Sequence, residues 1–233
     1  MNKYDVIIIG AGPSGIFCAY ELMRQKPDMK VLMIEKGRSI EKRQCPKRTT
    51  KVCVGCKPCS ITTGFAGAGA FSDGKLSLSP DVGGTLPEIL GYEKAEELIK
   101  EADNIYLKFG ADEKVYGIDD YEAIERIRAK AIRANLKLIE CPIRHLGTEE
   151  GYKIYTRLQE HLLASGVEIK FMTMVQDIII EDGVAKGVVT DKEETYYADE
   201  IVSGIGREGS SWFEGICKNH GIKTQNGTVD VGV

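Results

Sequence analysis

The sequence predicts an α/β fold, in which a largely parallel sheet carries a three-stranded antiparallel meander and is interrupted by a helical insertion. Three observations support this fold class. A strand, a helix and a second strand follow one another within residues 4–35, a series of strand-like segments follows Gly166, and amphipathic helices separate the two parts. We therefore expect one sheet to be built from both ends of the chain.

The N-terminal strands are indicated by short apolar runs. Residues 4–9 and 30–35 each have the composition of a buried strand, and residues 13–26 between them have the pattern of a helix. Residues 36–90 show no periodicity and are rich in Gly, Lys, Cys and Ser. Because irregular segments of this length are uncommon unless they serve a function, this segment is a candidate for part of a functional site.

Three helices are predicted next, from apolar residues at helical spacing. The first is marked by Ala95, Leu98, Ile99, Ala102, Ile105 and Tyr106. The second begins near the plausible caps Asp119 or Asp120. Its buried face is expected to consist of Tyr121, Ile124, Ile127, Ala131 and Leu136. The third covers about 152–164 and stops at Gly166.

Strands are predicted at 167–171, 174–182, 184–191 and 195–206, with a hairpin at Asp182-Gly183. Residues 226–233 have the pattern of a strand that is cut short, so we expect the chain to be the N-terminal part of a longer protein. The predicted domains are a discontinuous one formed by 1–90 and 150–210, a helical insertion at 91–149, and the start of a second, substrate domain at 211–233.

The composition excludes several classes of protein. The 233 residues are 42% hydrophobic and 28% charged, with a formal net charge of −4, which is ordinary for a globular protein and unlike a nucleic-acid-binding protein. No stretch approaches the length of a membrane span. With no secretion signal visible, we expect a cytoplasmic protein whose cysteines are reduced and serve metal binding or catalysis rather than a disulfide framework.

The first strand leads into a glycine-rich turn, "IIIGAGPSG". Gly10 permits the tight turn, Gly12 lets a pyrophosphate approach the backbone, and Gly15 allows the helix to pack on the sheet. The helix N-terminus then offers free N–H groups to the phosphates. Glu35 ends the second strand twenty residues later, where its carboxylate can accept hydrogen bonds from ribose hydroxyls. The residues predict a dinucleotide site and leave NAD and FAD open.

A resemblance separates these two cofactors. The segment "DVIIIGAGPSGIFCAYEL…VLMIEKG" resembles the opening of glutathione-reductase-type flavoproteins, and the later segments "GVEIKFMTMVQDIIIEDGVAKGVVT" and "ADEIVSGIGREGS" resemble their meander and their second glycine turn. The resemblance implies FAD. It adds the following residues to the expected cofactor site: Pro13, Ser14, Lys36, Val175 near the adenine, and Gly204 and Gly206 near the pyrophosphate.

The middle of the chain resembles a narrower group, the uncharacterised bacterial FAD-dependent dehydrogenases, through "CSITTGFAGAGAFSDGKLSLS". Ala66 stands where that family commonly has glycine. The resemblance implies that this stretch lies along the flavin ring, with candidate contacts at Gly67, Gly69, Ser72 and Lys75; a glycine-rich surface loop is the alternative. The second Gly-Asp motif of these flavoproteins does not occur in the sequence, so we expect the chain to hold only part of the FAD site.

Four cysteines lie within fifteen residues, in "CPKRTTKVCVGCKPC". The spacing of Cys45, Cys53, Cys56 and Cys59 resembles the ligands of a 4Fe–4S cluster, although the Cys-Pro pair comes first here, and tetrahedral zinc would suit the same four thiolates. The basic residues between them would offset the negative charge of the thiolates. A redox-active C-x2-C pair and a loop of unliganded cysteines are the alternatives.

We therefore predict an FAD-dependent oxidoreductase, a dehydrogenase of an unknown small-molecule substrate. Lys75 and Ser72 are the candidates for residues next to the flavin, NAD(P)H is a candidate electron donor, and an electron-transfer protein is a candidate partner. A flavin- or metal-binding redox module without turnover and a disulfide-type reductase are the alternative functions.

Overall fold

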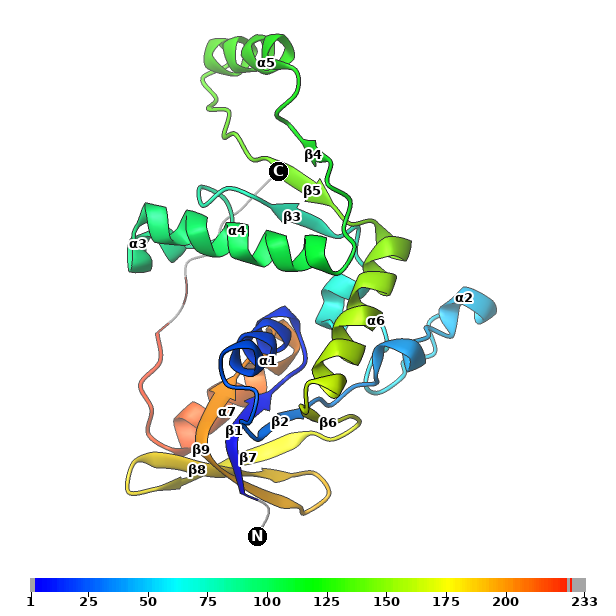
Figure 1. The fold of residues 1–233 in the computed structure, drawn as a ribbon, viewed down its shortest axis with the longest axis vertical. Coiled ribbons are helices and arrows are strands. Elements are labelled where there is room, and N and C mark those ends of the chain that lie inside the picture. Colours follow the sequence, from blue (N-terminus) through cyan, green and yellow to red (C-terminus); the bar gives the residue numbers. More distant parts are fainter. Residues whose placement is uncertain (1–2, 226, 228–233) are drawn as a thin grey trace. The chain divides into compact units, whose positions relative to one another are not determined.

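The computed structural model describes residues 3–225 and residue 227. The chain divides into two compact units. The first joins the N-terminal part through Ala68 to the part from Glu160 onward, and the second is Gly69–Gln159. The blue N-terminal strands and the orange strands near the C-terminus lie in one sheet, so both ends of the chain build the first unit (Figure 1).

The sheet of the first unit has six strands in the order β6-β2-β1-β9-β8-β7. They are β1 Lys3–Ile9, β2 Val31–Ile34, β6 Glu168–Lys170, β7 Val175–Glu181, β8 Val184–Thr190 and β9 Thr195–Ser203. The pairs from β6 through β2 and β1 to β9 are parallel, and β9, β8 and β7 form an antiparallel meander. The predicted fold class, a largely parallel sheet with a three-stranded meander, is confirmed.

The register brings the carboxyl ends of three strands to one edge. Ile9 of β1 lies beside Ile34 of β2 and beside Ser203 of β9. The apolar runs of β1 and β2 are almost completely buried, because the middle strands of such a sheet are covered on both faces. Helix α1, Pro13–Gln25, connects these two strands and buries Gly15, Ile16, Ala19, Tyr20 and Met23.

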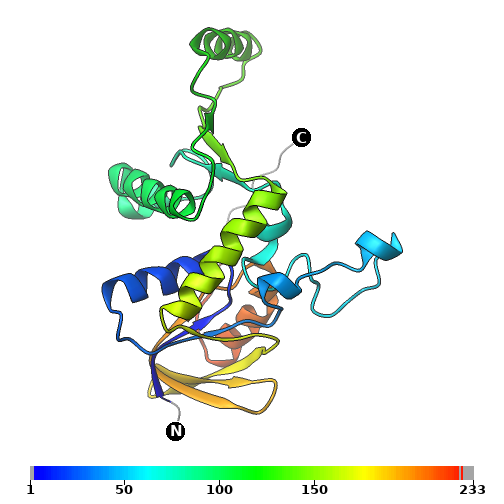
Figure 2. The ribbon, with the colours of Figure 1, turned by 45° about the vertical axis from the view of Figure 1, so that its right-hand side comes forward.

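Up to Phe71, the irregular segment after β2 contains only short helical pieces. In the first unit these are a 3₁₀ helix Ile40–Lys42 and α2, Lys47–Thr50, and the 3₁₀ helix Gly67–Phe71 runs across the boundary between the units. Figure 2 shows α2 at the end of a loop that extends away from the sheet of its unit. The 3₁₀ helix Arg207–Gly209 and α7, Ser210–Asn219, follow β9, and Ile216 of α7 belongs to the same buried apolar cluster as Val175, Val188 and Tyr196 of the meander.

The second unit contains a small antiparallel sheet with the order β3-β5-β4. Its strands are β3 Lys75–Ser77, β4 Val115–Tyr116 and β5 Ile143–His145, and its helices are α3 Leu86–Leu90, α4 Tyr92–Lys108, α5 Tyr121–Arg133 and most of α6 Thr148–Ala164. The buried guanidinium of Arg144 on β5 donates to both carboxylate oxygens of Asp103 on α4, at 2.5 and 2.8 Å. The expected insertion is thus not purely helical: strands of two or three residues leave no periodic pattern in a sequence.

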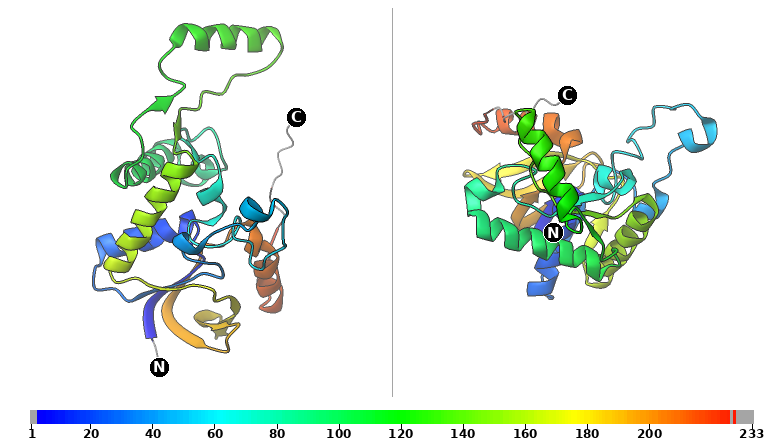
Figure 3. Two further views of the ribbon diagram at one scale, coloured as in Figure 1. Left: turned by 90° about the vertical axis from the view of Figure 1, so that its right-hand side faces the viewer. Right: turned by 90° about the horizontal axis from the view of Figure 1, so that it is seen from above.

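The burial predicted for the second helix is wrong. No residue of α5 is buried, and the side chains of Tyr121 and Leu136 are 76% and 66% exposed. Figure 3 shows α5 at the end of two extended segments, beyond the strands β4 and β5 of its unit. An apolar stripe shows which face of a helix favours burial, but it does not ensure that another part of the same chain packs against that face. The helix does begin where predicted, because Asp120 Oδ1 accepts a hydrogen bond from the Ala123 amide.

In the part of the chain that the structure describes, no helix combines the length and the apolar character that crossing a bilayer requires. The strand predicted at 226–233 falls outside the described residues, apart from residue 227. The assignment of 211–233 to a second domain therefore stays a prediction.

Candidate cofactor site

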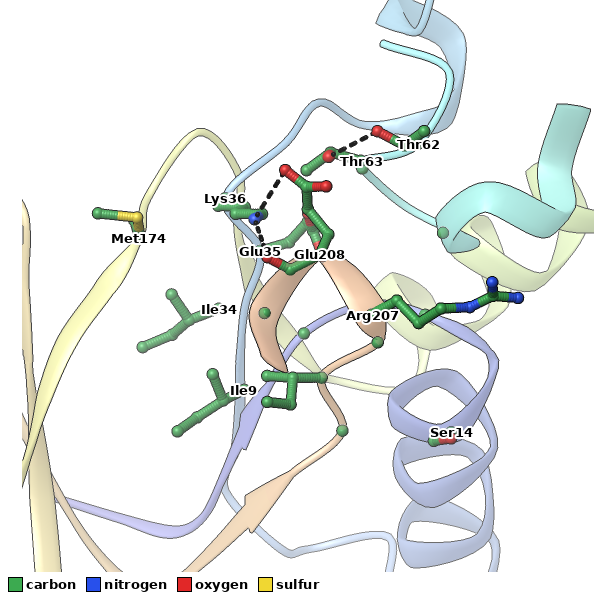
Figure 4. A pocket seen from close by; sticks show the side chains of 18 of the residues that line it. Ile9, Ser14, Ile34, Glu35, Lys36, Thr62, Thr63, Met174, Arg207 and Glu208 are labelled. Atoms are coloured by element: carbon green, nitrogen blue, oxygen red, sulfur yellow. Dashed lines mark hydrogen bonds and ion pairs between the residues drawn. The ribbon is translucent and has the colours of Figure 1, made fainter. Parts of the chain in front are cut away.

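A cavity of about 570 Å³ lies at the carboxyl edge of the six-stranded sheet (Figure 4). The residues that follow β1, β2 and β9 line it, together with residues from the irregular segment 62–68 and the start of β7. Ligands of parallel α/β sheets bind at this edge. The cavity brings together ten of the residues predicted from the sequence: Gly10, Gly12, Pro13, Ser14, Glu35, Lys36, Gly67, Val175, Gly204 and Gly206.

Three glycines make the floor of the cavity close-packed. Gly10 has a φ of +97°, and a Cβ atom on Gly15 would lie 2.0 Å from the Gly10 carbonyl oxygen, so a side chain at Gly15 would push α1 off the turn. Gly204 approaches from β9: its own Cβ would lie 3.1 Å from the Gly15 nitrogen. Gly15 thus supports the cavity from below without lining it.

The first turn of α1 is left free for an anion. Gly12 is its N-cap and has an extended conformation, no side chain caps the helix, and no acidic residue lies in the first turn. The N–H groups at this end therefore lack the side-chain partners that a helix N-terminus usually has. Their partial positive charge favours a phosphate group at this position.

Glu35 is buried, with 6% of its surface exposed, and its carboxylate is fixed by the backbone. Oε2 accepts a hydrogen bond from the Ala11 amide at 2.8 Å, and Oε1 accepts one from the Gly37 amide at 2.7 Å. Each oxygen keeps a further acceptor position. The glycine turn and the end of β2 are therefore tied together through this side chain, which can still accept hydrogen bonds from a ligand.

Arg43 organises the wall of the cavity, and it was missed by the sequence analysis. Its side chain is 2% exposed, and its guanidinium donates to four backbone carbonyls of one segment. Nε bonds Ser60 at 3.0 Å, Nη2 bonds Ile61 at 2.6 Å, and Nη1 bonds Phe65 at 2.5 Å and Gly67 at 2.6 Å. We call residues 60–67 the wall loop. Because it forms no strand or helix before residue 67, Arg43 supplies much of the hydrogen bonding that regular structure would provide.

Burial lowers the pKa of Arg43 to about 10, while the charges of Glu35 and Cys59 act in the opposite direction. The group is therefore still protonated at neutral pH. Backbone contacts fix the wall loop further, since the Ala66 amide donates to the Ala11 carbonyl at 2.7 Å and a Cβ on Gly37 would lie 2.4 Å from the Gly64 nitrogen. No local pattern in the sequence distinguishes Arg43 from the other basic residues around it.

Two ion-pairing residues lie at another side of the cavity. Lys36 Nζ lies 3.6 Å from Glu208 Oε1 and 3.4 Å from the Glu208 carbonyl oxygen (Figure 4). Glu208 belongs to the 3₁₀ helix after β9, so this pair ties the end of β2 to the end of β9. Lys36 was predicted from the sequence; Glu208 was not.

Three predicted flavin contacts belong to the second unit. Ser72 Oγ donates to the Gly69 carbonyl at 2.9 Å, and Lys75 pairs with Asp73 at 3.1 Å. Asp73, two residues before β3, also bonds Nε2 of His145 on β5 at 2.7 Å, and His145 lies opposite Lys75 in the β3–β5 pair. The flavin contacts of Gly69, Ser72 and Lys75 stay a prediction.

The four clustered cysteines have free thiols, and Cys53 is exposed. Within residues 3–225 and 227, no group of three or more His, Cys, Asp or Glu side chains is arranged to hold one metal ion. The geometry therefore gives no support to the predicted cluster or zinc site at Cys45, Cys53, Cys56 and Cys59. Cys59 differs electrostatically, because hydrogen bonds from Thr62 and Ile61 lower the pKa of its thiol.

Comparison with known protein families identifies the chain. The model of the FAD dependent oxidoreductase family named DAO matches residues 5–213, which is most of the sequence. The chain belongs to this family of FAD dependent oxidoreductases. The resemblance to the glutathione-reductase type and to a narrower dehydrogenase group goes beyond this match and stays a prediction.

Solved structures share the fold of this FAD dependent oxidoreductase. Glycine oxidase from Bacillus cereus is 19% identical with a TM-score of 0.51, over 94% of this chain and 58% of that one. L-amino acid deaminase from Proteus vulgaris is 14% identical with a TM-score of 0.53, over 95% and 50% of the two chains. A thiamine thiazole synthase from Coprinopsis cinerea is 52% identical over 33 residues, 14% of this chain and 10% of that protein. The present chain thus spans only part of the length of these proteins.

Proposed function

We propose that this chain provides the dinucleotide-binding part of an FAD-dependent oxidoreductase that oxidises or reduces a small molecule. The observation that carries the proposal is the cavity at the carboxyl ends of β1, β2 and β9. It presents the free first turn of α1 and the fixed carboxylate of Glu35 to the same space. The family match over residues 5–213 supports FAD as the dinucleotide.

The chemical groups that line the cavity suit the diphosphate and the ribose of FAD. A backbone without side chains at Gly10, Gly12 and Gly204 suits a diphosphate, and a carboxylate acceptor suits the hydroxyl donors of a ribose. FAD held there supplies a ring that takes up and releases electron pairs. The chain's own part is to bind and orient it: α1 for the diphosphate, Glu35 for the sugar, and the wall loop as a rigid side of the cavity.

Within this function, Gly69, Ser72 and Lys75 are proposed as flavin contacts, and NAD(P)H as a source of electrons. The resemblance of "GAGAFSDGK" to flavin-binding segments supports the three flavin contacts. A cation near the ring, such as Lys75, favours the anionic reduced flavin.

The test is the cofactor content of the purified protein and its dependence on Glu35. We expect the protein to bind FAD in preference to NAD, with absorption near ~450 nm that is typical of flavins. Replacing the carboxylate in Glu35→Gln places an amide N–H₂ group against one of two backbone N–H groups, so FAD affinity should fall about tenfold or more. The exposed Asp28→Asn variant is the matched control in the same unit.

Bleaching of the flavin by a reductant such as NAD(P)H, or by a substrate, distinguishes an enzyme from a passive carrier. The proposal fails if the protein takes up no FAD, or if Glu35→Gln and Asp28→Asn bind it equally well.

A further inference from the structure

Four charged side chains line the cofactor cavity, and three of them have partners. Glu35 accepts two backbone hydrogen bonds, and Lys36 pairs with Glu208. Arg207 is exposed, and in the part of the chain that the structure describes its guanidinium has no ion-pair or hydrogen-bond partner. The cavity therefore contains one positive charge that no neighbouring side chain neutralises.

Arg207 follows a strand end that packs on the first turn of α1. Gly204 donates to the Ile9 carbonyl at 2.9 Å, and a Cβ on Gly204 would lie 3.1 Å from the Gly15 nitrogen, which is a tight contact. Arg207 comes three residues later and opens the 3₁₀ helix that a hydrogen bond from the Gly209 amide to the Gly206 carbonyl closes at 2.9 Å. The position of this segment is thus fixed by the same glycine packing that forms the floor of the cavity.

The side chains of Arg207 and Glu208 leave this short helix in different directions (Figure 4). Glu208 reaches Lys36 near the end of β2, whereas Arg207 extends toward the side on which Ser14 begins α1. Arg207 and the residues Gly12, Pro13 and Ser14 line the same cavity. A cationic side chain and the uncapped end of a helix therefore face one space from two elements.

Such a pair of groups matches the chemistry of a diphosphate. Helix N–H groups and a guanidinium both donate hydrogen bonds to phosphate oxygens, and the planar guanidinium can donate two at once. A nucleoside without phosphate offers neither group an anionic acceptor. We propose that Arg207 binds the diphosphate of the dinucleotide opposite the first turn of α1, and thereby makes the cavity selective for diphosphate-bearing nucleotides. This inference rests on the proposed function.

The experiment compares ADP, adenosine and FAD as ligands of the purified protein by calorimetric titration. The variants are Arg207→Met, Arg207→Lys and the control Lys218→Met, an exposed cation on α7 of the same unit. Arg207→Met should weaken ADP and FAD about tenfold while leaving adenosine unchanged, because only the charge-assisted bonds to phosphate are lost. Arg207→Lys should recover part of the affinity for ADP, and Lys218→Met should bind all three ligands like the unmodified protein.

The decisive quantity is the ratio of the dissociation constants for adenosine and ADP. If Arg207→Met lowers this ratio by less than about threefold, the inference is overturned. An equal loss for adenosine and ADP overturns it as well, because it would indicate a distorted cavity. If the unmodified protein binds FAD but Arg207→Met has no effect, the proposed function stands and only the role of Arg207 falls. If the unmodified protein binds neither FAD nor ADP, both fall.

Discussion

Two neighbouring parts of one irregular segment differ in how far they are exposed to solvent. The wall loop, residues 60–67, is largely buried, with Phe65 and Ala66 at 0% exposure. The cysteine loop, residues 45–59, is largely exposed, and Val52 and Val54 are 69% and 56% exposed. Both are rich in turns and neither contains a strand.

The difference lies in where the backbone finds its hydrogen-bond partners. Four carbonyls of the wall loop are bonded by Arg43, so this segment can be buried without regular structure. The basic side chains of the cysteine loop, including Lys47, Lys51 and Lys57, are exposed. A basic side chain next to a loop thus stabilises that loop only when the side chain is buried and its N–H groups have hydrogen-bond acceptors. The exposed basic side chains of the cysteine loop contribute only charge to the surface.

The largest effect is expected for Arg43→Met. It removes the donors from four carbonyls in a buried environment, so the free energy of unfolding should fall by about 3–5 kcal/mol. Urea denaturation measures it, and FAD retention should fall in parallel. The control Arg48→Met, an exposed position of the cysteine loop, should change stability by no more than about 0.5 kcal/mol. Similar losses for the two variants would contradict the contrast between the loops.

A smaller effect is expected from alanine at two glycines with positive φ. A Cβ at Gly64, φ +123°, would lie 2.7 Å from the Arg38 carbonyl oxygen, whereas at Gly55, φ +62°, nothing lies within 4 Å. Gly64→Ala should cost about 3 kcal/mol, from strain plus collision, and Gly55→Ala about 1 kcal/mol, from strain alone. Thermal denaturation of the two variants provides the measurement. A larger loss at Gly55 would show that the cysteine loop is the more constrained one.

The third prediction concerns pH and thiol reactivity. Hydrogen bonds from Thr62 and Ile61 lower the pKa of Cys59, and since the thiolate is the nucleophile, its alkylation should become fast at a pH below that of an ordinary cysteine. Mass spectrometry of iodoacetamide-labelled peptides at a series of pH values measures this rate. Thr62→Ala should move the profile toward higher pH, because it removes the side-chain donor. An unchanged profile in Thr62→Ala would show that the hydroxyl of Thr62 does not contribute, and would leave the backbone amides of Thr62 and Ile61 as the cause.

The smallest effect is expected for Cys53→Ser. The side chain is exposed, so stability should change by less than about 0.5 kcal/mol. The same experiment tests the metal site predicted from the cysteine spacing. If protein purified without air contains iron or zinc, and Cys53→Ser loses both the metal and several kcal/mol of stability, the cysteine loop is a metal site when loaded.

The sequence was most informative where function requires a fixed local spacing. The turn from Gly10 to Gly15 and the acidic residue after the next strand are set by the geometry of one strand–helix–strand unit, and Glu35 lines the same cavity as Gly10 and Gly12. The parallel and antiparallel strands of the six-stranded sheet were also predicted, because each has its own apolar run.

What the sequence did not reveal depends on contacts between distant segments. Arg43 bonds carbonyls 17 to 24 residues away, and the Gly37–Gly64 contact joins two loops, so neither leaves a periodic signal. The apolar face of α5 is the converse case, since its pattern is clear but none of its residues is buried. Periodicity reports what a segment could bury, whereas burial itself is decided by the rest of the fold.

The contact between Gly15 and Gly204 has a consequence for how the protein is made. A ribosome-bound chain that ends before β9 already contains the glycine turn and Glu35, but it lacks the strand that lies beside β1 and the residue that packs on the start of α1. Closing the sheet around β1 is thus a late event in synthesis, because it joins residues almost 200 positions apart. A chain that stops upstream of β9 would lack Gly204 and Gly206 and with them part of the lining of the cavity, so we expect added flavin not to bind to it.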